Sequence, residues 1–76
     1  MPTIQRLPNC NIKMYPADHP PPHFHVVLND GREALVEIEG LALLPCKLKL
    51  REIDDALAWA DQNLALLKRE WKRLNP

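Results

Sequence analysis

The sequence has few of the residues that several large classes of protein depend on. Its two cysteines are too few for a disulfide framework and suit a reducing compartment. Ten Lys and Arg balance ten Asp and Glu, so the formal net charge is zero, whereas a protein that coats DNA or RNA is clearly basic. No apolar run approaches the ~20 residues of a membrane span, and the first residues contain no apolar stretch of signal-peptide length. We therefore expect a cytoplasmic protein with no membrane partner.

The chain is also short. Its 76 residues allow one small domain, residues 1–76, and leave no room for a second lobe or a separate cofactor domain. Hydrophobic burial at about 25 cal/mol per Å² nearly cancels an ordering entropy of roughly 1.5 kcal/mol per residue, so a monomer of this size is marginally stable. Self-association, a partner protein or a bound metal would each add stability.

Charge and periodicity divide the chain into two parts. Residues 1–46 hold three basic and five acidic side chains, and residues 47–76 hold seven against five, so the two parts carry net charges of −2 and +2. The pattern over residues 1–45 is typical of short strands broken by proline, and that over 46–76 is helical. We predict an α+β fold, in which a small antiparallel sheet of three to four short strands is followed by a C-terminal helix.

The clearest local pattern is a β-hairpin, whose strands at residues 23–28 and 32–39 flank an Asn-Asp-Gly turn. A two-residue turn would place apolar side chains opposite acidic ones. A three-residue turn that ends with Gly31 in the left-handed region pairs Phe24 with Val36 and collects the apolar side chains on one face. A register shift of one residue would move every side chain to the other face, so we predict the three-residue turn. Shorter strands are expected at residues 3–7 and 10–15, and residues 41–44 form a loop or a short extra strand.

The second part of the chain carries one apolar stripe at helical spacing. An unbroken helix over residues 51–74 would be about 36 Å long at 1.5 Å per residue, whereas a chain of this length has an expected radius of gyration of about 11 Å. We therefore predict a kink or a split near residues 61–63, where Asp, Gln and Asn cluster. The alternative is an intact helix that pairs with a second chain. The stripe consists of Ile53, Leu57, Ala60, Leu64, Leu67, Trp71 and Leu74.

All three histidines of the chain lie within seven positions. His23 and His25 are two residues apart on a predicted strand, so their rings point to the same side, and the predicted register places Glu37 opposite His23. The prolines at 20–22 restrict the backbone between His19 and the strand. Histidines beside a carboxylate are typical ligands of Zn²⁺ or Ni²⁺, which makes His19, His23, His25 and Glu37 candidate metal ligands.

Two other interpretations of these histidines stay open. In the first, one neutral imidazole acts as a general base and a second, protonated one as a general acid, which is the logic of metal-free RNA cleavage. Such a site also needs cations near the phosphate, and no spacing in the sequence shows that any converge there. In the second, the histidines are structural and hydrogen-bond the backbone. A basic stretch near the C-terminus suits either the helix dipole and solubility or a contact with nucleic acid.

Several of these segments resemble a family of small prokaryotic proteins, the domain-of-unknown-function family 4160. The resemblance rests on Met-Pro-Thr-Ile at residues 1–4, Ile-Lys-Met-Tyr at 12–15 and Asp-His-Pro-Pro-Pro-His-Phe-His at 18–25. Trp59 and Trp71 also fit the helical pattern of the family. Residues 41–50 match more loosely, and the longer C-terminal tail of the family is missing.

The resemblance implies where activity would lie, without supplying a reaction. Some members of the family are described as the toxin of a type II toxin–antitoxin pair. Carried over, the family motif makes Asp18, His19, His23 and His25 the candidate catalytic residues, with a cognate antitoxin-like small protein as the partner and RNA as a candidate substrate. The alternative function is a non-enzymatic module that binds a divalent metal or another protein.

Overall fold

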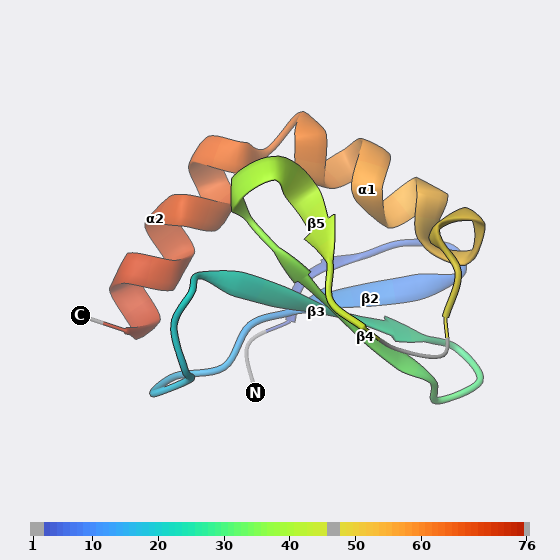
Figure 1. Ribbon diagram of the computed structural model, residues 1–76, viewed down its shortest axis with the longest axis horizontal. Helices are drawn as coiled ribbons and strands as arrows, with labels where there is room; N and C mark the ends of the chain where they lie inside the picture. The colour runs from blue at the N-terminus through green and yellow to red at the C-terminus, as the bar shows by residue number, and fades with distance from the viewer. Residues whose placement is uncertain (1–2, 46–47, 76) are drawn as a thin grey trace.

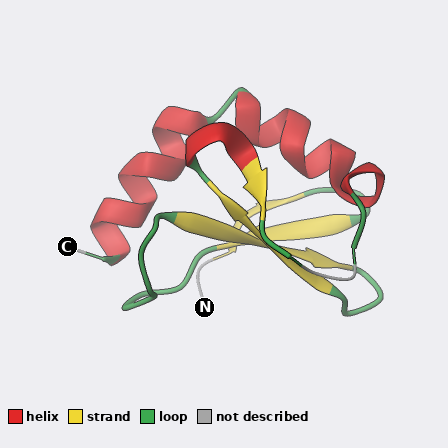
Figure 2. Ribbon diagram, viewed as in Figure 1, coloured by secondary structure: helices red, strands yellow, loops and turns green. Residues whose placement is uncertain are grey.

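An antiparallel sheet with two helices on one of its faces forms the described part of the chain (Figure 1). The computed structural model describes residues 3–45 and 48–75. In this part the strands are β1 (Thr3–Arg6), β2 (Cys10–Lys13), β3 (His23–Leu28), β4 (Glu33–Glu37) and β5 (Ala42–Leu43). The helical elements are the 3₁₀ turns η1 (Glu39–Leu41) and η2 (Leu50–Ile53) and the helices α1 (Asp54–Asp61) and α2 (Leu64–Leu74). The fold is therefore α+β, with strands first and helices last (Figure 2).

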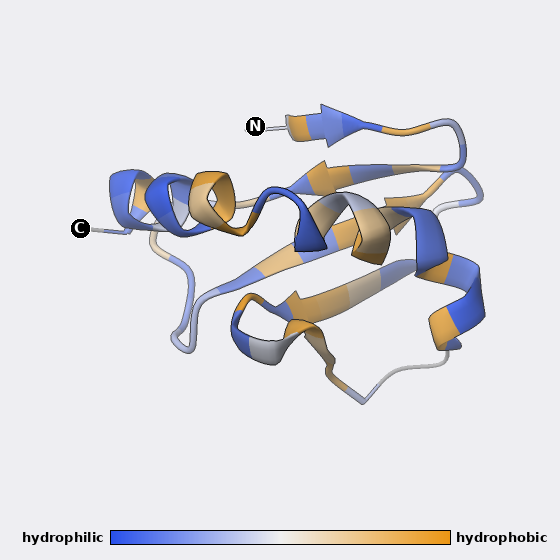
Figure 3. Cartoon of the chain, turned by 90° about the horizontal axis from the view of Figure 1, so that it is seen from above, coloured by the Kyte–Doolittle hydropathy of each residue, from blue (hydrophilic) through white to orange (hydrophobic). Residues whose placement is uncertain are grey.

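The sheet is wider than the three to four strands predicted. Within the described residues it has five strands. They lie in sequence order, each antiparallel to the next (Figure 3). The additional strand is β5, which pairs Ala42 with Glu37 and Leu43 with Val36. Gly40, at a φ of 75°, lets the chain reverse direction immediately before it. Two residues are too few to show an alternating pattern, which is why this segment could be a loop or a strand by sequence alone.

The β3–β4 hairpin has the predicted register. Phe24 pairs with Val36 and His23 with Glu37, and the backbone N–H of Leu28 donates to the carbonyl of Arg32 at 2.7 Å. Gly31 closes the turn at a φ of 94°, in the left-handed region that the three-residue turn requires. The apolar face of the hairpin is accordingly buried under the helices.

The C-terminal helix is split at the predicted place, and the alternative prediction of an intact helix is wrong. α1 ends at Asp61 and α2 begins at Leu64, and the side chain of Asn63 donates a hydrogen bond of 2.8 Å to the carbonyl of Trp59. The break lets both helices follow the sheet, and the radius of gyration is 11.3 Å. Within residues 3–45 and 48–75, no helix has the length and apolar character needed to cross a membrane.

The core lies between the helices and one face of the sheet. Three of its fully buried side chains, Ile12, Phe24 and Leu67, come from β2, β3 and α2. Cys10 is buried among them as a free thiol, and burial, with a smaller contribution from the charge of Asp55, raises its pKa. Cys46 lies outside the described residues, as do Met1 and Pro2 of the family-like opening.

Candidate functional site

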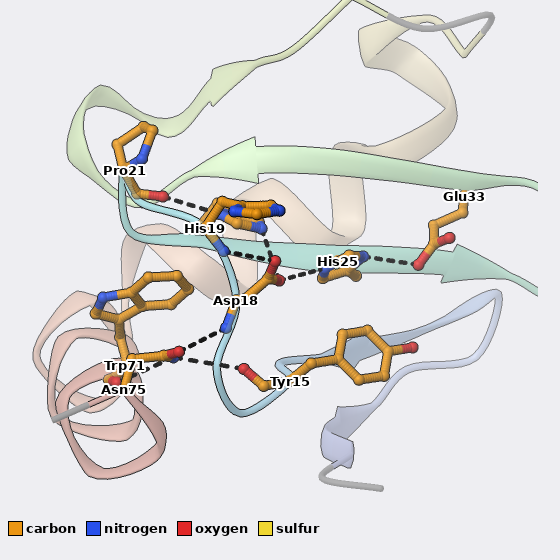
Figure 4. A network of polar contacts seen from close by, with 9 residues as sticks. Tyr15, Asp18, His19, Pro21, His25, Glu33, Trp71 and Asn75 are labelled. Atoms are coloured by element: carbon orange, nitrogen blue, oxygen red, sulfur yellow. Dashed lines mark hydrogen bonds and ion pairs between the residues drawn. The ribbon is translucent and has the colours of Figure 1, made fainter.

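The loop between β2 and β3 is fixed to the end of α2, and this attachment positions Asp18. The backbone N–H of Asp18 donates to Oδ1 of Asn75 at 2.7 Å, and Nδ2 of Asn75 donates to the carbonyl of Tyr15 at 3.4 Å (Figure 4). The carboxylate of Asp18 accepts a further bond at Oδ1, from the backbone N–H of His19 at 2.8 Å. Oδ2 therefore remains directed at the neighbouring histidines.

Two histidines of β3 meet that oxygen. His23 and His25 lie on the same face of the strand, and their Nε2 atoms are 2.9 Å and 3.2 Å from Oδ2 of Asp18. One donor atom from each of the three residues lies within 4.8 Å of the others. We call Asp18, His23 and His25 the triad.

The opposite nitrogen of each ring is anchored. Nδ1 of His23 lies 2.8 Å from the carbonyl oxygen of Pro21, and Nδ1 of His25 lies 2.8 Å from Oε2 of Glu33. A carbonyl and a carboxylate oxygen only accept hydrogen bonds, so each Nδ1 carries the hydrogen. If each ring carries only that hydrogen, both Nε2 lone pairs face the same oxygen of Asp18. If Nε2 is protonated as well, the ring is charged and donates to that oxygen, as the 3.2 Å hydrogen-bond distance from Nε2 of His25 allows.

This arrangement is incomplete as it stands. Nε2 of His23 is buried and has no hydrogen-bond partner among the described atoms, although it lies 2.9 Å from Oδ2 of Asp18. A lone pair that faces a carboxylate oxygen across this distance is repelled unless a positive species lies between them. Either a proton or a metal ion is therefore required inside the triad.

The electrostatic surroundings keep Asp18 ionised. Burial acts to raise the pKa of Asp18, but the hydrogen bonds from His25 and the His19 backbone, together with the charge of His23, outweigh it and hold the pKa below its ordinary value. The carboxylate is thus available as an anionic ligand or as a partner for a protonated ring.

Aromatic rings and limited exposure enclose the triad. The ring of Tyr15 meets that of His25 edge-on with centroids 4.6 Å apart, and Trp71 lies against His23 at 5.2 Å. The side chain of His23 is 6% exposed and that of Asp18 is 21% exposed. Asp18 also lines a hollow of about 530 Å³ near the C-terminal end of α2, which gives the carboxylate contact with solvent.

The structure brings together only part of the residue set predicted from sequence. His23, His25 and Asp18 converge, whereas the side chain of His19 is exposed and only its backbone takes part. Glu37 pairs with His23 in register, but no hydrogen bond or ion pair joins these two described side chains, and Glu37 lines a groove beside α2. The candidate metal ligands are therefore Asp18, His23 and His25, without His19 and Glu37.

Two supporting residues were missed in the sequence. Leu35 is the direct strand partner of His25, and Glu33 precedes Leu35 by two positions on the same face of the sheet. Glu33 and His25 are therefore diagonal neighbours, which a long side chain can bridge. The predicted hairpin already contained that signal. Asn75 had none, because its contact with Asp18 depends on where the end of α2 packs.

Comparison with known proteins identifies one family. The family model described as "Domain of unknown function (DUF4160)" matches residues 10–72, which is most of the chain. No curated protein and no solved structure matches the chain.

Proposed function

The chain belongs to the DUF4160 family, and we propose that it binds one divalent transition-metal ion through Asp18, His23 and His25. The observation that carries the proposal is the buried Nε2 of His23, which has no hydrogen-bond partner and faces both the Asp18 carboxylate and His25. A metal ion placed among the three donor atoms accepts both nitrogen lone pairs and neutralises the carboxylate.

The spacing of the donor atoms suits such an ion. Around a tetrahedral Zn²⁺ with bonds of about 2.0–2.1 Å, neighbouring ligand atoms lie roughly 3.3 Å apart. The Nε2 atoms of His23 and His25 are 2.9 Å and 3.2 Å from Oδ2 of Asp18. These two distances need to change by only a few tenths of an ångström, and all three donor atoms lie within 4.8 Å of one another. Zn²⁺ or Ni²⁺ fits a set of two imidazoles and one carboxylate.

The contacts behind the rings also match those of metal ligands. A metal-bound histidine commonly donates its second ring nitrogen to a carbonyl or carboxylate, which fixes the tautomer and the ring orientation. Pro21 and Glu33 provide one group of each kind. Three protein ligands leave a position for water or substrate, as in hydrolytic zinc centres, so the triad is suited to metal-assisted hydrolysis.

Isothermal titration of the metal-free protein with Zn²⁺ and with Ni²⁺ tests the proposal. We expect one ion per chain, a higher melting temperature with metal, and at least a tenfold weaker affinity in Asp18→Asn and His25→Gln. His19→Gln is the matched control, because it removes an exposed imidazole of the same loop. The proposal is wrong if the native chain binds neither ion, or if His19→Gln weakens binding as much as the triad variants.

A proton could occupy the triad in place of the metal ion, and ¹⁵N NMR of the histidine rings distinguishes the two. If a proton bridges His23 and Asp18 and is not displaced, Zn²⁺ does not change the ring signals of His23. If the metal occupies the triad, the Nε2 signals of His23 and His25 both shift on stoichiometric addition, and those of His19 do not.

A second candidate function is the toxin-like component of a toxin–antitoxin module, paired with a cognate small protein. It is supported by the family resemblance and by the convergence of Asp18, His23 and His25. Two adjacent imidazoles could act as base and acid on RNA without a metal. Expression of the native chain should inhibit growth, and His25→Ala should abolish inhibition while the chain still folds. Equal inhibition by the variant would remove this candidate.

A further inference from the structure

A groove of about 620 Å³ lies beside α2, and two of its lining residues, Trp71 and Pro21, also contact His23 of the triad. Its walls are α2, the β4–η1 junction and the loop that precedes β3, and these segments lie near one another in both ribbon views (Figures 1 and 3). We call it the α2 groove. Its volume is within the range of about 300–1,000 Å³ that is usual for small-molecule sites.

The lining of the α2 groove is apolar at its centre. Trp71 and Ile38 are buried and form its base, and Pro21 and Pro22 form one wall. These flat or rigid side chains offer a surface on which a planar ring can lie at little entropic cost. The groove is therefore shaped for a ligand with a flat body.

Charges of opposite sign border this apolar centre. Lys68, Arg69 and Lys72 of α2 lie on one rim, and Glu37 and Glu39 lie on the other. In the described part of the chain, none of these five side chains forms an ion pair. Arg73, in contrast, which does not line the groove, is paired with Glu70 at 2.7 Å. Each rim thus keeps its charge available for a ligand.

A ligand that satisfies all three features carries an anion at one end, a planar ring, and hydrogen-bond donors at the other end. Lysine and arginine side chains recognise phosphate, and carboxylates accept from N–H groups. Guanine presents two adjacent donors, the ring N1–H and the 2-amino group, which together match one carboxylate. Adenine instead presents the acceptor N1 beside its amino group, so a carboxylate would face a lone pair.

We propose that the α2 groove binds a guanine nucleotide, with the ring on Trp71 and the prolines. The phosphate lies on the Lys68, Arg69 and Lys72 rim, and the donor edge of the base faces Glu37 or Glu39. This site is independent of the metal proposal, because none of its charged residues belongs to the triad. The guanine and phosphate could be supplied by a free nucleotide or by the 5′ end of an RNA.

Titration with guanosine 5′-monophosphate, in the presence of a chelator and followed through the indole N–H signal of Trp71, tests the groove. We expect saturable binding that is at least tenfold tighter than for adenosine 5′-monophosphate or inorganic phosphate. A short oligoribonucleotide with a 5′-phosphorylated guanosine is the second arm. Tighter binding of the oligonucleotide assigns the site to an RNA end, and equal or weaker binding assigns it to the free nucleotide.

Variants of the two rims test which part of the nucleotide each rim binds. The double variant Lys68→Ala and Lys72→Ala should weaken guanosine 5′-monophosphate at least tenfold, whereas Arg73→Ala, the same charge on the same helix, should change affinity less than twofold. The double variant Glu37→Gln and Glu39→Gln should remove the preference over the adenine nucleotide. Absence of binding, equal affinity for both nucleotides in the native chain, or an equal effect of Arg73→Ala would overturn the proposal.

A metal-ligand variant separates this inference from the proposed function. Asp18→Asn should lose Zn²⁺ binding and keep the affinity for guanosine 5′-monophosphate. If Zn²⁺ fails to bind the native chain while the nucleotide binds, the metal proposal alone is overturned. If the nucleotide fails to bind while Zn²⁺ binds, the groove proposal alone is overturned.

Discussion

Asn75 accepts a hydrogen bond of 2.7 Å from the backbone N–H of Asp18, which precedes it by 57 positions in the chain. The same side chain donates to the carbonyls of Tyr15 and Trp71 at 3.4 Å and 3.3 Å. One amide thus joins the loop that carries the carboxylate to the end of α2. Asn75 also lies beyond residues 10–72, the segment that matches the family model.

We predict that Asn75→Ala weakens both the fold and the proposed metal site. Loss of the Asp18 contact should cost about 1 kcal/mol of unfolding free energy, the usual net value of one hydrogen bond, and should lower Zn²⁺ affinity several-fold because Asp18 is no longer held. Urea unfolding and titration calorimetry measure the two effects.

Asn63→Ala is the matched control for this prediction. The Asn63 amide bonds the carbonyl of Trp59, four residues earlier, as the Asn75 amide bonds that of Trp71, but no bond joins Asn63 to the triad loop. The Asn63→Ala variant should therefore be less stable than the native chain but should bind Zn²⁺ with the same affinity. Equal losses of affinity in both variants would show that Asn75 acts only through global stability.

Gly31 should tolerate asparagine better than alanine. Its φ of 94° lies in the region that L-residues rarely adopt, although no atom lies within 4 Å of an added Cβ. The cost is therefore backbone strain, and Gly31→Ala should lose about 1–2 kcal/mol of unfolding free energy. Gly31→Asn should lose clearly less, because asparagine enters the left-handed region more readily. Thermal unfolding of the two variants gives the comparison, and equal stabilities would contradict it.

Leu67 should be the most sensitive leucine of α2. It is fully buried, so Leu67→Ala removes apolar contacts and leaves a cavity, at a cost of about 2–5 kcal/mol. Leu50→Ala is the control, since Leu50 is 54% exposed and its truncation should change stability by less than about 0.5 kcal/mol. Urea unfolding measures the loss of unfolding free energy in both variants. Similar losses would contradict the burial of Leu67 in the core.

The ionised side chain of Glu52 should stabilise the fold at neutral pH and not in acid. The backbone N–H of Lys49 and the guanidinium of Arg32 outweigh the effect of burial and hold the pKa of Glu52 below its ordinary value of 4.5. A carboxyl with a depressed pKa in the folded state stabilises the fold above the unfolded pKa, and this contribution is lost as the pH falls through the folded pKa. The melting temperature of Glu52→Gln should therefore be lower than that of the native chain at pH 7 and equal to it well below pH 4. A gap that persists in acid would contradict this.

Local pattern predicted the parts of the fold that depend on neighbouring residues. The hairpin register followed from the turn ending at Gly31, and the split helix followed from three weak helix formers at 61–63. The predicted number of strands was too low because β5 has only two residues, which are too few to show an alternating pattern. Its position depends on the reversal at Gly40, which the sequence alone does not reveal.

The sequence indicated the segment in which the three side chains converge, but which residues converge there depended on three-dimensional packing. Alternation on one strand placed His23 and His25 together. His19 was included because it is near in sequence, and Glu37 because it is opposite in register, yet neither rule fixes where a side chain points. Asp18 belongs to the cluster in a loop whose backbone is anchored by Asn75, 57 positions later in the chain.

The succession of strands in the sheet sets the order in which the molecule can assemble. Each strand pairs with its immediate neighbour along the chain, so the meander can form by closing short loops, which is fast. The hydrogen bonds of Asn75 with Asp18 and Tyr15 instead join residues 57 and 60 positions apart, and they can form only once α2 has docked. During refolding we therefore expect Zn²⁺ capture to follow the burial of Trp71 rather than the formation of the sheet. The proposed metal site would be the last part of the protein to form.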